Sequence, residues 1–185
     1  YIQDHPASSF EVEELSRLVM AGELRQVKQL LYNSTLGIIN EKDSEGSTPL
    51  HRAVRNMHSE MIEFLLNMGA DVDVTEADGV TALHVAASLG NVDCIYLLAG
   101  VNKANVNAMT EAHGRTALDI AVKSECMATI CTLLNLGADP NRRVPSDEES
   151  EALTDIRSYI RKVGHYSKFK SPFFLAVELG LDRII

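Results

Sequence analysis

The chain has 185 residues, of which 45% are hydrophobic and 23% are charged, which suits one globular domain with a sizeable buried core. Aromatic residues make up only 5% and tryptophan is absent, so the core must consist of Leu, Ile, Val, Ala and Met, which favours small packed helices over a β-sandwich. The formal net charge of −9 argues against a nucleic-acid partner. No apolar run approaches the ~18 residues of a membrane span, so no membrane insertion is expected.

The first 42 residues show a helix–turn–helix pattern that carries many charges. We expect residues 1–10 to be a loose lead-in and residues 11–42 to be a degenerate capping repeat. The two helices and their turn are marked by Leu15, Leu18, Val19, Ala21, Gly22, Val27, Leu30 and Leu31. Charged side chains along this segment suit a terminal unit with one face in water.

Three blocks of eight residues then recur in register. They begin at Gly46, Gly79 and Gly114, which are 33 and then 35 residues apart. The blocks read Gly-Ser-Thr-Pro-Leu-His-Arg-Ala, Gly-Val-Thr-Ala-Leu-His-Val-Ala and Gly-Arg-Thr-Ala-Leu-Asp-Ile-Ala. An apolar helical stretch that contains a Leu-Leu pair follows each block. This self-similarity predicts structural repeats at residues 43–74, 75–107 and 108–141.

Each residue type in the block has a physical role at its position. Thr48 and its equivalents are expected to cap a helix, and Pro49 fits the first helical turn, where its missing N–H costs nothing. Leu50 and its equivalents should point inward, and Ala53 and its equivalents allow close helix contact. Each unit is therefore a helix, a tight turn, a second helix and an extended hairpin loop. Neighbouring units must stack, because no unit can bury its apolar face alone.

The block resembles the signature of the ankyrin repeat, Thr-Pro-Leu-His-x-Ala, which recurs with a period near 33 residues. The resemblance implies an all-α fold, an ankyrin-repeat solenoid of stacked helix-turn-helix units joined by β-hairpin loops. It also implies protein binding on the concave side, which the hairpin tips and the exposed face of each first helix form in this family.

Two positions depart from the family pattern. Two residues are added in the second repeat, at Ala99–Asn107, and we expect them to reshape one hairpin loop. Asp119 stands in the third repeat where the family usually has His. The family's hydrogen bond from this His to the capping Thr is therefore in doubt there.

Residues 142–168 do not follow the repeat pattern and are predicted to be an insertion. Ser146 and Glu149 form a capping-box pattern, and an amphipathic helix is expected over residues 147–163, with Leu153, Ile156, Ile160 and Val163 on one face. This helix either packs on the solenoid or docks a partner. Residues 169–185 resemble the start of a partial fourth repeat. We therefore expect a longer protein, with further repeats or domains beyond Ile185.

No constellation in the sequence predicts catalysis, a cofactor or a metal site. Cys126 and Cys131 lie about 140° apart around one predicted helix, so they do not converge on one metal ion. The glycines punctuate repeats instead of forming a phosphate-binding loop. We therefore expect no enzyme activity. The three cysteines, including Cys94, fit small core positions and an intracellular, cytoplasmic location, with a nuclear one left open.

The resemblance places fifteen residues at partner-binding positions. They are Ser44, Glu45, Ser47, Arg55, Asn56, Ala77, Asp78, Val80, Ser88, Leu89, Ala112, His113, Arg115, Lys123 and Ser124. Val80 and Leu89 are apolar at positions that should face solvent, and the neighbouring cations suit an acidic or amphipathic peptide. The family is also known for hydroxylation of hairpin asparagines, for which Asn107 and Asn141 are the candidates.

Two functions fit this sequence. The first is a non-catalytic scaffold or adaptor whose partner is another protein or peptide. The alternative is a regulatory ankyrin segment of a larger multidomain protein, such as a ubiquitin-ligase adaptor, a channel or an enzyme, whose activity lies outside these residues.

Overall fold

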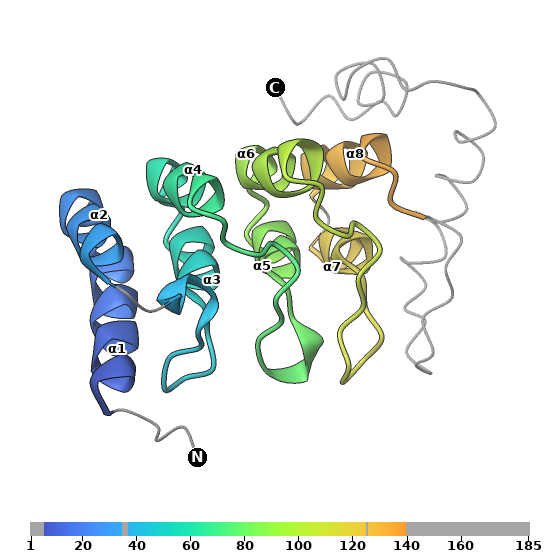
Figure 1. Ribbon diagram of the computed structural model, residues 1–185. Helices are drawn as coiled ribbons and strands as arrows, with labels where there is room; N and C mark the ends of the chain where they lie inside the picture. Colours follow the sequence, from blue (N-terminus) through green and yellow to red (C-terminus); the bar gives the residue numbers. More distant parts are fainter. Residues whose placement is uncertain (1–5, 35–36, 125, 140–185) are drawn as a thin grey trace, which may run out of the picture.

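The computed structural model describes residues 6–34, 37–124 and 126–139, which form a row of stacked helix pairs (Figure 1). The pairs are α1 with α2, α3 with α4, α5 with α6, and α7 with α8. Figure 1 shows α3, α5 and α7 as an inner row and α4, α6 and α8 as an outer row, with hairpin loops below. The bounds are α1 Pro6–Ala21, α2 Leu24–Asn33, η1 Ile38–Asn40, α3 Pro49–Arg55, α4 Ser59–Asn67, η2 Ala77–Gly79, α5 Ala82–Ser88, α6 Val92–Ile95, η3 Tyr96–Val101, α7 Ala117–Lys123 and α8 Met127–Asn135. The predicted all-α solenoid is confirmed.

The inner helices begin where the repeated threonines predict. The Thr48 hydroxyl accepts a hydrogen bond from the His51 amide, and Pro49 occupies the first turn of α3. Thr81 and Thr116 precede α5 and α7 in the same extended conformation. A short hydroxyl side chain at this position satisfies an amide that has no partner within the helix.

The core runs through the described repeats without a break. Leu50, Leu83 and Leu118 are buried, and so are the alanines three positions after each of them. The α1–α2 pair joins the same core through Leu15 and Val27. Each inner helix therefore packs against the next one along the row, as the small alanine side chains allow.

The hairpin loops connect the units without regular strands among the described residues. Thr75 and Thr81 form one isolated antiparallel bridge. The next hairpin tip is bound to this one, because the Glu111 amide donates to the Asp78 carbonyl at 2.6 Å. A Cβ atom on Gly79, whose φ is +73°, would lie 2.7 Å from the Glu111 nitrogen, so only glycine fits this close approach.

The two extra residues of the second repeat are divided between two places. The Ala104 amide binds the Leu98 carbonyl six positions earlier, whereas the matching bond in the first repeat, from Ala70 to Leu65, spans five positions. One residue is therefore absorbed at the helix end, where η3 is π-helical. The other lengthens the following hairpin, since Thr110 binds Arg115 across five positions and Glu76 binds Val80 across four. The expectation that a hairpin loop alone is reshaped is corrected in this way.

Other expectations differ from the structure or lie beyond its described part. Helix α1 begins at Pro6, so residues 6–10, expected in a loose lead-in, are helical. The insertion at 142–168, the partial repeat at 169–185 and Asn141 lie outside the described residues. No helix among the described residues has the length and apolar character of a membrane span.

Candidate partner-binding surface

The repeated histidines connect each repeat to the next. Nδ1 of His84 accepts the Thr81 amide at 3.1 Å, so the proton of the neutral ring is on Nε2. Nε2 lies 3.1 Å from the carbonyl oxygens of both Ala108 and Arg115 in the third repeat. Burial lowers the pKa of His84, and the bonds to the carbonyls offset this only in part. His51 makes the equivalent bond to the Val80 carbonyl. These histidines therefore have structural roles.

Asp119 keeps half of this arrangement. The Thr116 amide and hydroxyl both donate to its Oδ2 at 2.9 Å, so the local cap of α7 is intact. The bond between the side chain and the capping Thr, doubtful from the sequence, is thus present. A carboxylate cannot donate, however, so α7 lacks the N–H with which His51 and His84 bind the following repeat.

Arg52 and Asp43, both in the first repeat, form a buried ion pair that also contacts α1 of the capping unit. Arg52 donates from Nε to Asp43 Oδ2 at 2.8 Å, and the Ser16 hydroxyl of α1 donates to the same oxygen at 2.6 Å. Burial alone would raise the pKa of Asp43, but these bonds and the Ser47 amide outweigh it and lower the pKa to about 2. The pair locks α1, the first hairpin and α3 together.

Arg55 is not free to bind a partner. Its guanidinium binds the Glu76 carboxylate with both terminal nitrogens and donates to the Ser47 hydroxyl at 3.0 Å. The expectation that Ser47 is exposed is wrong, because it retains only 4% exposure beneath this contact. Glu76 was missed from the sequence, although it stands 33 residues after Asp43, at the same hairpin position.

Val80 and Arg115 also differ from the expectation. Val80 is half-buried and packs against the core, so it does not present an apolar side chain to solvent. Arg115 is half-buried and its carbonyl accepts from His84. The predicted cationic rim therefore reduces to Lys123, which is exposed at the end of α7.

Four more of the predicted residues already take part in internal bonds. Glu45 accepts from Arg52, the Ser44 amide donates to Glu13, Asn56 donates to the Arg52 carbonyl, and Ser88 donates to the Val85 carbonyl. The other exposed positions lie at the second and third hairpin tips and at the ends of α5 and α7. We call them the inner surface, which consists of Ala77, Asp78, Leu89, Ala112, His113, Lys123 and Ser124.

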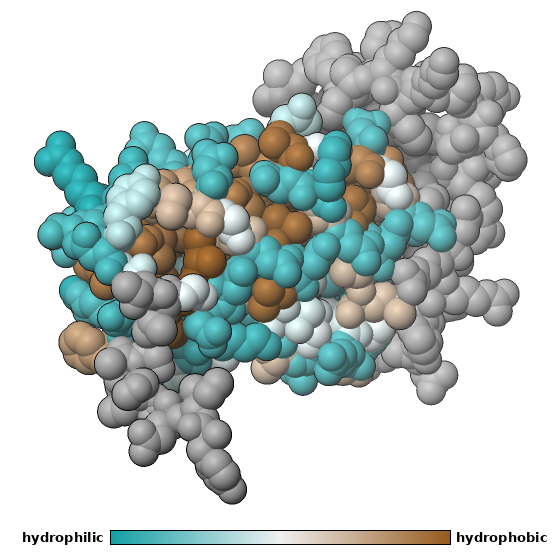
Figure 2. Space-filling model, in the orientation of Figure 1, coloured by the Kyte–Doolittle hydropathy of each residue, from teal (hydrophilic) through white to brown (hydrophobic). Residues whose placement is uncertain are grey.

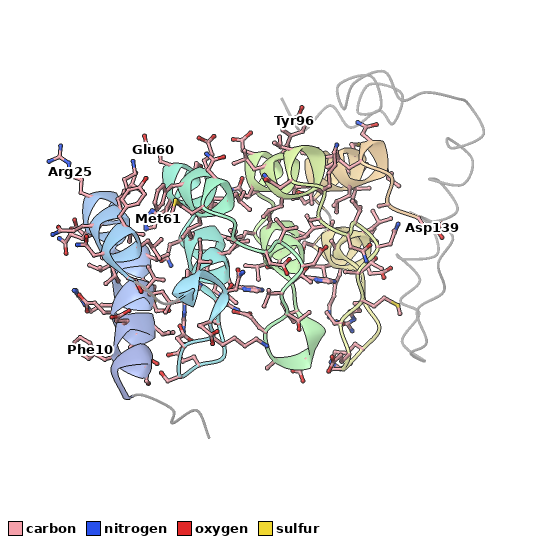
Figure 3. All side chains as sticks on the ribbon, in the orientation of Figure 1. Phe10, Arg25, Glu60, Met61, Tyr96 and Asp139 are labelled. Carbon is pink, nitrogen blue, oxygen red and sulfur yellow. The ribbon has the colours of Figure 1, made fainter. Side chains whose placement is uncertain are left out.

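The inner surface combines one apolar side chain with polar ones. Leu89 is 43% exposed where α5 ends. The hairpin tips that carry Asp78 and His113 are joined by the Glu111–Asp78 bond, and α5 packs on α7. The side chains of the described repeats are drawn in Figure 3. The inner surface therefore presents one apolar side chain and charged side chains of both signs across two adjacent repeats.

The thiols and carboxylates do not assemble a reactive centre in the part of the chain that the structure describes. Burial raises the pKa of Cys94 and of Cys131, which disfavours their thiolates. Cys126 accepts a hydrogen bond from Thr129 at 3.1 Å. Residues 6–34, 37–124 and 126–139 contain no group of three His, Cys, Asp or Glu residues arranged to hold a metal ion.

The known proteins with which this chain shares sequence similarity include two channels and a ubiquitin ligase. The transient receptor potential channel pyrexia of Drosophila melanogaster is 41% identical over 103 residues, and the human transient receptor potential cation channel subfamily A member 1 is 30% identical over 119 residues. The E3 ubiquitin-protein ligase KEG of Arabidopsis thaliana is 28% identical over 165 residues. The alignments cover 55%, 64% and 82% of this chain but only 10%, 10% and 9% of the respective relatives. The chain thus corresponds to about a tenth of each of them.

Two family descriptions match the repeats directly. "Ankyrin repeats (3 copies)" matches residues 68–144, and "Ankyrin repeats (many copies)" matches residues 30–86. Both fall on the helix pairs, threonine caps and hairpins described above. The chain belongs to the ankyrin-repeat family.

Proposed function

We propose that the repeats recognise another protein and bind an amphipathic segment of it along the inner surface. The observation that carries this proposal is Leu89, an apolar side chain left 43% exposed directly after the end of α5. Elsewhere on the inner surface, Lys123 at the end of α7 and Asp78 at the second hairpin tip are exposed and carry charges of opposite sign. An apolar centre with a polar rim is the usual composition of a protein-binding patch.

The partner's chemistry follows from which charges the fold leaves available. Arg55 is held by Glu76, and Arg115 is half-buried, so a purely acidic peptide would find only Lys123 at the helix ends. A segment with an apolar anchor and charges of both signs fits better. Such a segment would place its anchor on Leu89 and its acidic group near Lys123.

We further propose that this recognition serves a larger protein. The relatives named above are channels and a ubiquitin ligase, and the aligned region is about a tenth of each. In such a protein the repeats would be a regulatory or targeting segment, without catalysis of their own. An intracellular, cytoplasmic location is part of this proposal, supported by three cysteines that are free thiols.

Site-specific cross-linking tests the inner surface. A photoreactive amino acid at position 89 should capture a partner in cells, and mass spectrometry then identifies it. Against that partner, Leu89→Glu combined with Lys123→Glu should weaken binding at least tenfold, because the apolar anchor and the available cation are both lost.

The matched control makes the same exchanges on another surface. Tyr32→Glu with Lys28→Glu introduces equal charge on α2, where Tyr32 is 67% exposed. Binding by this control should stay within twofold of the parent. Equal losses in both variants would point to net charge instead of the inner surface and would contradict the proposal.

A further inference from the structure

A second apolar cluster lies on the outer helices of the second and third repeats. Tyr96 is 59% and Val101 is 56% exposed, and Leu97 and Leu136 are half-buried beside the core. We call these four residues the outer patch. Figure 2 shows hydrophobic surface over α6 and α8, and Figure 3 shows Tyr96 pointing away from the molecule at this edge. The outer patch lies across the helix pairs from the hairpin tips, so it is separate from the inner surface.

The π-helical segment η3 brings the two exposed side chains toward the same side. In an α-helix, residues five positions apart lie about 140° apart around the axis, so Tyr96 and Val101 would face different directions. A π-helical turn closes over five positions instead, as the Asn102 amide does when it binds the Leu97 carbonyl at 3.2 Å. Val101 therefore follows Tyr96 about one turn later, and both remain exposed. Such segments occur frequently at functional sites.

Gly100 brings the outer patch together across two repeats. A Cβ atom at this glycine would lie 3.0 Å from Tyr96 Cδ2 and 3.4 Å from Leu136 Cδ2. The Tyr96 ring therefore lies over bare backbone, next to a side chain that follows the end of α8. The absence of a side chain at position 100 lets the two repeats share one apolar surface.

The repeat itself does not require this patch. Counted from the capping threonines, Tyr96 and Gly100 correspond to Glu63 and Asn67 of the first repeat. Both of these residues are polar and exposed. The second repeat has thus replaced a solvated surface by an apolar one, at the π-helical segment that absorbs its extra residue.

Negative charge borders the outer patch. Helices α4, α6, η3 and α8 contain neither lysine nor arginine. Their exposed charged residues are Glu60 and Glu63 on α4 and Asp93 on α6. Lys103 follows η3, and its ammonium group donates to the Gly100 carbonyl at 2.8 Å. An apolar surface beside a row of carboxylates is complementary to a segment that is apolar on one face and basic at its edge.

We infer that the outer patch binds a basic amphipathic helix of another protein. The apolar face of this helix lies on Tyr96 and Val101, and its basic edge meets the carboxylates of α4 and α6. A helix of about 18 residues is about 27 Å long, and packed helices lie about 8–10 Å apart, so it can cross α4, α6 and α8. A second copy of this chain fits less well, because it would bring the same carboxylates and a net charge of −9 to the contact.

Titration of the whole 185-residue chain with a defined peptide tests this binding. The peptide has about 18 residues, with leucine at helical spacing on one face and lysine on the other, and fluorescence anisotropy follows its binding. Tyr96→Ser with Val101→Ser should weaken binding at least tenfold, because the apolar contact is lost. The control, Tyr32→Ser with Met109→Ser, removes exposed side chains elsewhere and should stay within twofold of the parent.

Neutralisation of the carboxylates tests the charge of the partner. Glu60→Gln, Glu63→Gln and Asp93→Asn together should weaken binding at least fivefold and reduce its dependence on salt. A peptide with glutamate in place of lysine should not bind. The matched control removes three exposed carboxylates from the hairpins and should change binding less than twofold; its changes are Glu41→Gln, Asp78→Asn and Glu111→Gln.

Three results would overturn the inference. The first is absence of binding by the parent, and the second is equal binding by a variant and its control, which would show that the peptide responds to net charge alone. The third is a dimer in sedimentation velocity that Tyr96→Ser with Val101→Ser abolishes, which would identify a second copy as the occupant. Leu89→Glu with Lys123→Glu should leave peptide binding undiminished, so failure at the inner surface and failure at the outer patch are distinguishable.

Discussion

Two carboxylates bind the same guanidinium in different surroundings. Asp43 is 2% exposed in its side chain and Glu45 is 73% exposed, and both accept from Arg52. Removing a buried partner leaves a charge without compensation, whereas an exposed ion pair contributes little. We expect Asp43→Asn to lower the free energy of unfolding by about 3 kcal/mol and Glu45→Gln by less than about 1 kcal/mol. Urea titration of both variants at neutral pH measures the difference.

The same carboxylate makes the stability depend on acid. A folded-state pKa of about 2 lies below the ordinary value of 3.8, so the contribution of Asp43 is complete above pH ~4 and is lost as the pH falls through about 2. It amounts to about 2 kcal/mol. The Asp43→Asn variant should lack this part of the acid dependence. A variant with the parent's slope between pH 4 and 2 would contradict the role of Asp43.

The second and third hairpin tips contact each other, and glycine substitutions can test how much this contact contributes to stability. Gly79 and Gly46 have almost the same φ, +73° and +77°, but only at Gly79 would a Cβ atom meet another hairpin, since nothing lies within 4 Å of Gly46. Both alanine variants incur the left-handed strain of about 1 kcal/mol. Gly79→Ala should be a further 1–2 kcal/mol less stable, on the order of an overpacked contact. If both variants denatured at the same temperature, the contact between the hairpin tips would not contribute to stability, which would contradict this prediction.

The elements were predictable where a single residue determines the local backbone. Thr48, Pro49 and the positive-φ glycines mark helix and turn positions by their own chemistry, and the structure places them as expected. The two places that accommodate the extra residues were not predictable, because the spacing of the repeats shows only that two residues are added in total. The Arg55–Glu76 contact was not predictable either, because the repeat pattern does not specify which residue a long side chain binds. The sequence pattern therefore predicted where the partner-binding residues lie, but not which of them are already bonded to other residues of the chain.

For the whole molecule, the cross-repeat histidines determine how far unfolding in one repeat spreads to the next. Replacing His84 by Asp, the residue that the third repeat already has at this position, should keep the helix cap but remove the donor to Ala108 and Arg115. We expect a loss of about 2 kcal/mol, because buried carbonyls lose a partner. Denaturation followed by two probes should become less concerted. Coincident transitions at unchanged stability would contradict this coupling, and Asp119→Asn serves as the comparison.

The divided insertion has a consequence for how such arrays change in evolution. One residue is taken up by a π-helical turn at the end of an outer helix and one by a hairpin, and the inner helices still stack on each other. A gene for this solenoid can therefore gain or lose single codons at these two places without shifting the phase of the repeat. Variation in repeat length then alters the ends of the outer helices and the hairpin tips, so new surfaces become accessible by insertion as well as by substitution.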